Sequence, residues 1–191
     1  MHAGAPKDSD SPDPGRTTAH QREAARQAEE ERVLLLQRVQ PGLSGLIDGS
    51  LSSLAPIFAV VVSTQKPGYA FVAGLATAIG AAISMAFSEG LSDTGAVTER
   101  GNAWKRGCVV GGGTFLGGIL HTLPFLIPDY LPALAVALAV VVVELVVLAW
   151  LRHRFFGVSF AGSLATVTLG GVLIAGISIG LGALLGTSIA D

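Results

Sequence analysis

Three side chains with metal-binding chemistry lie in two long apolar stretches of the chain. Asp48 stands near the start of one stretch, and Met85 and Glu89 stand near the end of the next. Met85, Glu89 and Asp93 are spaced i, i+4, i+8, so they share one face of a helix. Two carboxylates and a thioether suit a borderline first-row divalent ion such as Fe²⁺ or Mn²⁺. The sequence therefore predicts a metal site formed by Asp48, Met85 and Glu89.

Other polar residues are placed to support this site. Ser44 and Ser52 lie four residues on either side of Asp48, where they would hold metal ligands in position from a second layer. Asp93 and Glu99 follow the second apolar stretch and are candidates for a cytoplasmic entry path. Each ligand also has a simpler interpretation. A lone methionine often fills a core, and acids near a helix end often reach for water.

Depth in the membrane links the two carboxylates. Asp48 lies a few residues inside the start of its stretch and Glu89 a few residues before the end of its own. At 1.5 Å per residue, both are expected within about 10 Å of the same membrane face. The loop between the two stretches is short, so the two helices are expected to be neighbours.

Two further ionisable groups lie in apolar surroundings. Glu144 interrupts a run of aliphatic residues and is expected about 12 Å from the Arg152 end of its helix. It is a candidate proton carrier or a further ligand, and the alternative is a single interhelical hydrogen bond. His121 is expected at the outer end of the third stretch, where it would help to release an ion or a proton. The alternative for His121 is a satisfied interfacial residue.

Composition places these residues in a membrane. The 191-residue chain is 50% hydrophobic and only 14% charged, against roughly 25% charged in soluble domains. Mean hydropathy is +0.60, and the charged residues concentrate before Pro41. The single cysteine, Cys108, excludes a disulfide within the chain. The sequence has no basic stripe, so nucleic-acid binding is not predicted.

The charge pattern divides the chain into three segments. Residues 1–20 are rich in Asp, Ser, Pro and Gly, have no signal-peptide core, and are predicted to be disordered. Residues 21–40 are predicted to form a charged cytoplasmic or juxtamembrane helix. Residues 41–191 are predicted to form an all-α integral membrane domain.

Five apolar stretches in this domain are each long enough to cross a hydrocarbon layer of about 30 Å. They are separated by turn residues and polar loops, and they cover residues 42–64, 69–92, 107–127, 131–151 and 160–189. The sequence therefore predicts a bundle of five transmembrane helices.

Basic loop residues orient the bundle. Arg100, Lys105, Arg106, Arg152 and Arg154 fall on the same side as the N-terminal arm, and Lys66 on the other. The positive-inside rule then places the N-terminus in the cytoplasm and the C-terminus outside. We expect a multi-pass protein of the bacterial inner (plasma) membrane.

Glycine spacing favours close helix packing within the bundle or between two copies. Gly113 and Gly117, Gly176 and Gly180, and Gly182 and Gly186 form Gly-x-x-x-Gly pairs. No G-x-S-x-G or H-E-x-x-H motif is present, and spacing indicates no Ser–His pair for a hydrolase. The protein is therefore not predicted to be an enzyme.

The strings "GLIDGSLSSLAPIFA", "GAAISMAFSEGLS" and "HTLPFLIPDY" resemble the vacuolar iron transporter family. The resemblance covers about residues 38–190 and is greatest to the membrane domain of bacterial membrane-bound ferritins. It implies five helices, a homodimer and proton-coupled efflux of Fe²⁺ or Mn²⁺, with the metal as substrate and no cofactor. The family's intramembrane aspartate, methionine and second-helix glutamate match Asp48, Met85 and Glu89.

Two departures from the family concern metal delivery. The loop 93–106 lacks the Glu-rich helical segment that many members carry. The N-terminal arm lacks the Glu-x-x-His pairs of a ferritin-like di-iron domain. The arm is therefore expected to recruit a cytoplasmic partner that delivers iron.

Two other functions fit the same residues. One is a membrane anchor or assembly protein that transports nothing and binds partners through its Gly-x-x-x-Gly helices and charged arm. The other is a proton or monovalent cation channel that uses the same acids. Met85 distinguishes them from a metal transporter, because a thioether contributes little to the passage of protons or Na⁺.

Overall fold

The computed structural model describes residues 14–92 and 100–189, and every regular element in these ranges is helical. In chain order the elements are α1 (Pro14–Leu34), a π-helical turn η1 (Leu35–Val39), α2 (Gln40–Ser52), α3 (Leu54–Thr64), α4 (Pro67–Ser92), α5 (Ala103–Leu120), a 3₁₀ turn η2 (Leu123–Leu126), α6 (Tyr130–Phe156) and α7 (Phe160–Ile189).

Contacts divide the chain into two units, residues 1–34 and residues 35–191. In the first unit, α1 begins at Pro14, earlier than the predicted boundary at residue 21. Its described side chains, from Gln21 to Leu34, are exposed, and Arg32 pairs with Glu29 at 3.5 Å one turn away. Residues 1–13, where the disordered tail is predicted, lie outside the described residues.

The helices have the character of a membrane protein. Among the described residues, four helical runs are long and apolar enough to cross a membrane: Gln21–Thr64, Pro67–Ser92, Tyr130–Phe156 and Phe160–Leu184. The protein is thus all-α and multi-pass by the length and composition of its helices. The predicted third span becomes two elements, because α5 ends at Leu120 and η2 follows. α5 is not among the four apolar runs, since glycines and two basic residues dilute its apolar content.

The first span is broken where the chain carries a proline. α2 ends at Ser52, Ser53 forms a turn, and α3 starts at Leu54. Pro56 has no N–H to donate to the carbonyl of Ser52, so the helical hydrogen bonding is interrupted at this point. The break leaves Ser53 buried, at 1% exposure.

Helix α5 packs closely against both α2 and α4 through glycines. A Cβ at Gly45 or Gly49 of α2 would collide with backbone atoms of α5, at Val110 and Thr114 respectively. On another face of α5, a Cβ at Gly111 would lie 2.6 Å from the carbonyl oxygen of Ala82 in α4. These contacts fix α2 and α4 on two sides of α5.

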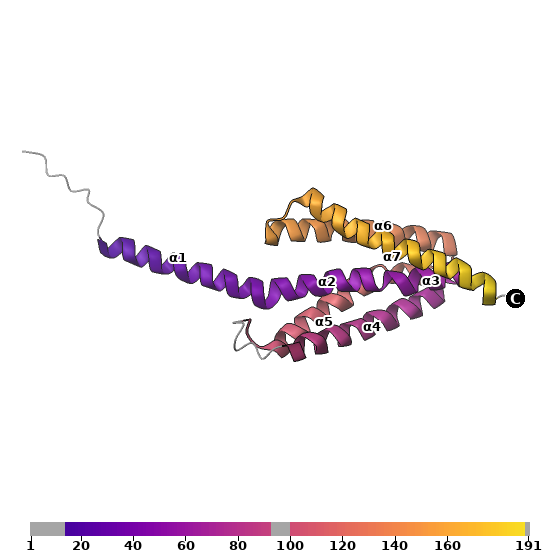
Figure 1. The fold of residues 1–191 in the computed structure, drawn as a ribbon, viewed down its shortest axis with the longest axis horizontal. Coiled ribbons are helices and arrows are strands. Elements are labelled where there is room, and N and C mark those ends of the chain that lie inside the picture. The colour runs from indigo at the N-terminus through magenta and orange to yellow at the C-terminus, as the bar shows by residue number, and fades with distance from the viewer. Residues whose placement is uncertain (1–13, 93–99, 190–191) are drawn as a thin grey trace, which may run out of the picture. The chain divides into compact units, whose positions relative to one another are not determined.

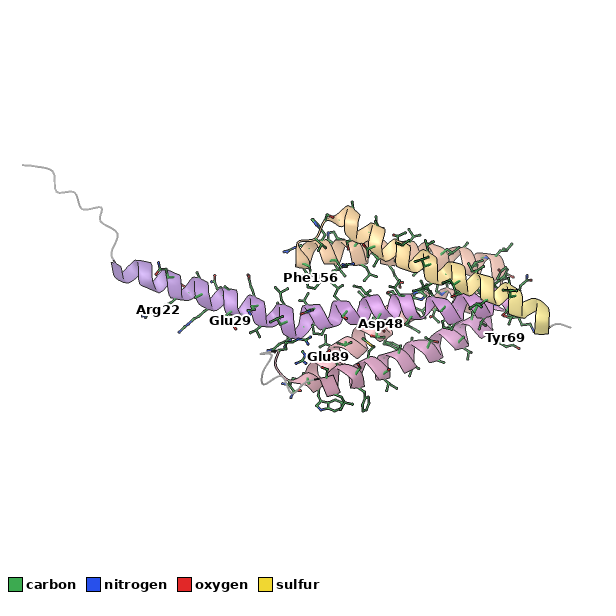
Figure 2. All side chains as sticks on the ribbon, viewed as in Figure 1. Arg22, Glu29, Asp48, Tyr69, Glu89 and Phe156 are labelled. Atoms are coloured by element: carbon green, nitrogen blue, oxygen red, sulfur yellow. The ribbon has the colours of Figure 1, made fainter. Side chains whose placement is uncertain are left out.

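Within this unit, α2 and α3 lie between the pair α4–α5 and the pair α6–α7 (Figure 1). The main apolar core gathers around α3, where Ile57, Phe58 and Val61 are buried against Ala70 and Phe125. Figure 2 shows Glu89 and Phe156 at one end of the bundle and Tyr69 at the other. This arrangement agrees with the predicted grouping of loops on two sides.

Candidate functional site

A pair of ionisable side chains is buried between α5 and α6. His121, the residue that ends α5, is 1% exposed, and Glu144 in the middle of α6 is 9% exposed. His121 Nδ1 lies 2.8 Å from Glu144 Oε2. The sequence predicts these two residues separately as relay groups, and the structure brings them into one hydrogen bond.

Ser53 extends this pair to the first span. Its Oγ lies 2.9 Å from His121 Nε2 and donates to the carbonyl oxygen of Gly49 at 2.6 Å. The break before Pro56 places Ser53 where its hydroxyl faces α5. The result is a chain of three hydrogen-bonded side chains from three helices, Ser53, His121 and Glu144.

This chain is suited to holding and moving a proton. When Ser53 donates to Gly49, its oxygen accepts from Nε2–H of His121. The proton between Nδ1 and Oε2 then belongs either to an imidazolium beside a carboxylate or to a carboxylic acid beside a neutral imidazole. The two forms differ only by the position of one proton, which is the property that a relay requires.

The same connectivity occurs in Ser–His–acid hydrolases, where the serine attacks a carbonyl. Spacing did not indicate this Ser–His pair, because Ser53 and His121 are distant in the sequence. Both residues are 1% exposed, and neither lines the cavity beside Glu144.

Glu89, a predicted metal ligand, is held by arginines. Its Oε1 accepts from Arg106 Nε at 2.7 Å and lies 3.3 Å from Arg100 Nη2. Arg106 is 1% exposed and also donates from Nη1 to the carbonyl oxygens of Arg100 and Gly101. From the sequence we expect Arg106 to be a loop cation, whereas in the structure it is a buried residue that ties the start of α5 to α4.

Asp48 and Glu89 sit at different levels of the bundle. Asp48 precedes Gly49, which contacts Thr114 of α5, whereas Glu89 pairs with Arg106. Arg106 and Thr114 are a little over two helical turns apart, a rise of about 12 Å. The first and second apolar stretches were predicted to be neighbours, and they do meet where α3 contacts α4. Helix α2, which carries Asp48, packs chiefly against α5. Within one chain, Asp48 and Glu89 therefore do not lie at the same depth.

The remaining predicted site residues lie on half-open or open surfaces. Asp48 and Met85 are half-buried, and Ser44 and Ser52 are exposed on α2. Ser44, Asp48 and Ser52 thus form a polar stripe along the outer side of this helix. Asp93 and Glu99, the predicted entry residues, lie outside the described residues.

Among the described residues, no group of three or more His, Cys, Asp or Glu side chains is placed to hold a metal ion. The donor set of Asp48 and Met85 remains a prediction for metal binding, and Glu89 already has cationic partners.

A cavity of about 560 Å³ lies beside Glu144. It is lined by apolar side chains of α2, α5 and α6, together with Ser50 and Glu144. Glu144 is therefore a neighbour both of the buried His121 and of an open apolar space.

No family model, curated protein or solved structure matches this chain. Its function is therefore argued from its helices, its buried hydrogen-bonded chain and its open polar stripe.

Proposed function

We propose that the protein is a proton-coupled transporter of a divalent transition metal, Fe²⁺ or Mn²⁺, that exports the ion from the cytoplasm. The observation that carries the proposal is the buried hydrogen bond, 2.8 Å long, between His121 at the end of α5 and Glu144 of the apolar helix α6. Ionisable groups are costly inside a membrane, and they commonly mark proton or ion pathways.

The open stripe on α2 supports a role in ion passage. A carboxylate on the outer side of a membrane helix needs water, an ion or a second chain beside it. In this proposal the stripe of Ser44, Asp48 and Ser52 faces a second copy, and the ion path runs between the two copies. The homodimer is also what the resemblance to vacuolar iron transporters implies.

Asp48 and Met85 are the proposed metal ligands, with one hard and one soft donor. Protons compete with the metal for Asp48, because the ligand must be deprotonated to bind. An acidic outer solution would then favour release of the metal in exchange for a proton, which Glu144 and His121 carry.

Transport in proteoliposomes tests the proposal. Mn²⁺ or Fe²⁺ flux is measured by quenching of a trapped chelating dye, with and without a pH gradient. We expect Asp48→Asn to abolish flux and Glu144→Gln to remove its dependence on the gradient. The control is Asp129→Asn, since Asp129 is an exposed acid outside the cavity beside Glu144. Flux that keeps its gradient dependence in Glu144→Gln would contradict the proposal.

Proton transport without a metal is the second candidate, and the pairing of Glu89 with Arg106 favours it. A glutamate that is neutralised by arginine is not free to bind a cation, so the predicted donor set loses one carboxylate. Proton flux is followed with a trapped pH dye in metal-free buffer. Flux that persists in Met85→Leu and disappears in Glu144→Gln would support this second candidate.

The third candidate function is that of a membrane anchor or assembly protein, and it leads to a simpler expectation for transport. A protein that serves only to bind partners would show neither metal flux nor proton flux above that of empty vesicles.

A further inference from the structure

The cavity beside Glu144 has the composition of a binding site for a small lipophilic molecule. Its volume of about 560 Å³ falls in the range of ligand pockets in proteins, about 300–1,000 Å³. It is lined by Leu46 and Ser50 of α2, by Leu120 at the end of α5, and by a face of α6 that includes Ala139 and Glu144. A largely apolar wall with a few polar groups is typical of such pockets.

One carboxylate oxygen of Glu144, a residue that lines this cavity, has no hydrogen-bond partner. Oε2 is bound to His121, but Oε1 is buried and has no hydrogen-bond partner. While Oε2 and Nδ1 share their proton, Oε1 carries only lone pairs, so it needs a donor. A buried polar atom without a partner costs about 1–3 kcal/mol. A ligand that supplied an N–H group would recover this cost.

The charge of the lining indicates the charge of the ligand. Among the described residues that line the cavity, Glu144 is the only ionisable one, and no basic side chain faces it there. No charge in this lining would repel a positive group, and Ser50 adds a hydroxyl that can accept or donate.

We infer that this cavity binds a lipophilic amine, with its ammonium group at Glu144 and its apolar body against the aliphatic side chains of α6. The site is distinct from the predicted metal ligands Asp48 and Met85. It requires no assumption about which ion the protein transports, so its test is a binding measurement and not a flux measurement.

Dansylcadaverine is a suitable probe, because it joins an apolar fluorophore to a primary ammonium. Binding to the purified full chain in lipid nanodiscs is followed by the rise in dansyl fluorescence. We expect saturable binding of this amine. N-pentyl dansylamide, which has the same body without the ammonium, should bind about tenfold more weakly or worse.

Two variants test the location. Glu144→Gln keeps the shape but removes the charge, and it should weaken amine binding about tenfold while leaving the neutral analogue unchanged. Ala139→Trp fills the cavity and should abolish binding of the amine. Leu138→Trp is the matched control, since Leu138 is an exposed neighbour on α6 that does not line the cavity.

Equal binding of the amine and its neutral analogue would overturn the inference and indicate a site for lipid tails. Unchanged amine binding in Ala139→Trp would also overturn it. If Glu144→Gln fails to fold, the inference is still tested by comparing the binding of dansylcadaverine and N-pentyl dansylamide to the unaltered protein and to Ala139→Trp. Absence of binding, with a change from dimer to monomer in Ala139→Trp, would instead assign the cavity to a second copy of the chain.

Discussion

Among the described residues, Glu89 and Glu144 each bind a buried basic side chain, and the chemistry of the two contacts differs. Arg106 holds Glu89 with a guanidinium that stays charged at any physiological pH, so this pair is a fixed tie between α4 and α5. His121 holds Glu144 through a proton that either partner can carry. The first pair is therefore interpreted as structural, and the second as the group that responds to protons.

Removing one member of the second pair should destabilise the protein more than removing both. His121→Leu leaves the carboxyl of Glu144 buried without its partner, and we expect a loss of about 3 kcal/mol in the free energy of unfolding. The double variant His121→Leu, Glu144→Leu should recover most of this loss, because an apolar pair leaves no unpaired charge. Thermal unfolding is measured in one detergent for the unaltered protein, the two single variants and the double variant. Strictly additive effects of the two substitutions would contradict this prediction.

The pair of Glu89 and Arg106 predicts a loss of stability when Glu89 is neutralised. Glu89→Gln replaces a charge-assisted hydrogen bond to a buried arginine, and we expect a cost of about 2 kcal/mol. Lys105→Ala is the control, because Lys105 is exposed on the same turn of α5. A variant with unchanged thermal stability but lost metal binding would return Glu89 to the metal site.

The buried hydrogen-bonded side chains Ser53, His121 and Glu144 were only partly predictable from the sequence. Glu144 was recognisable because one acid stood in a long aliphatic run, and His121 because it was a lone histidine near a span end. Their pairing was not predictable, because it depends on how the third and fourth helices cross. Ser53 gave no signal among several serines, and only the break before Pro56 turns it to the interior.

At the level of helices, small residues decide which elements touch. α5 lies between α2 and α4 because its glycines and those of α2 remove the side chains that would hold the backbones apart. The sequence predicted close packing from Gly-x-x-x-Gly spacing. It did not predict the partners. Short-loop reasoning placed the first span beside the second, which holds for α3 and α4, whereas α2 packs chiefly against α5. The glycine contacts with α5 explain the difference.

Two glycine variants test this packing. Gly49→Ala would drive a methyl group into the backbone of α5 at Thr114, and we expect a loss of about 3 kcal/mol with a broadened profile in size-exclusion chromatography. Gly112→Ala is the matched control, because nothing lies within 4 Å of a Cβ there. It should keep or slightly raise the stability, since alanine is the better helix former. Equal behaviour of the two variants would refute the close contact.

Over the whole molecule, the open question is whether α5 crosses the membrane. Four apolar runs are evident, and five spans need α5 as well. If α5 crosses, the turn at Asp129 lies on the same side as Lys66, and Arg154 lies on the opposite side.

Single cysteines in a Cys108→Ser background test this arrangement. We expect a membrane-impermeant maleimide to label Lys66→Cys and Asp129→Cys in intact cells, and Arg154→Cys only after permeabilisation. All three positions are exposed in the structure, so lack of labelling would report sidedness and not burial. Labelling of Asp129→Cys only after permeabilisation would show that α5 does not cross.

The dependence of α5 on its neighbours also bears on how the protein is made. A segment that is rich in glycine and carries Lys105 and Arg106 in its first turn is a poor substrate for the insertion machinery by itself. The backbones of α2 and α4, synthesised earlier, provide the surface that accepts it. We therefore expect membrane integration of α5 to be a late, cooperative event during biogenesis, and a chain that lacks α2 should leave α5 outside the bilayer even though the sequence of α5 is unchanged.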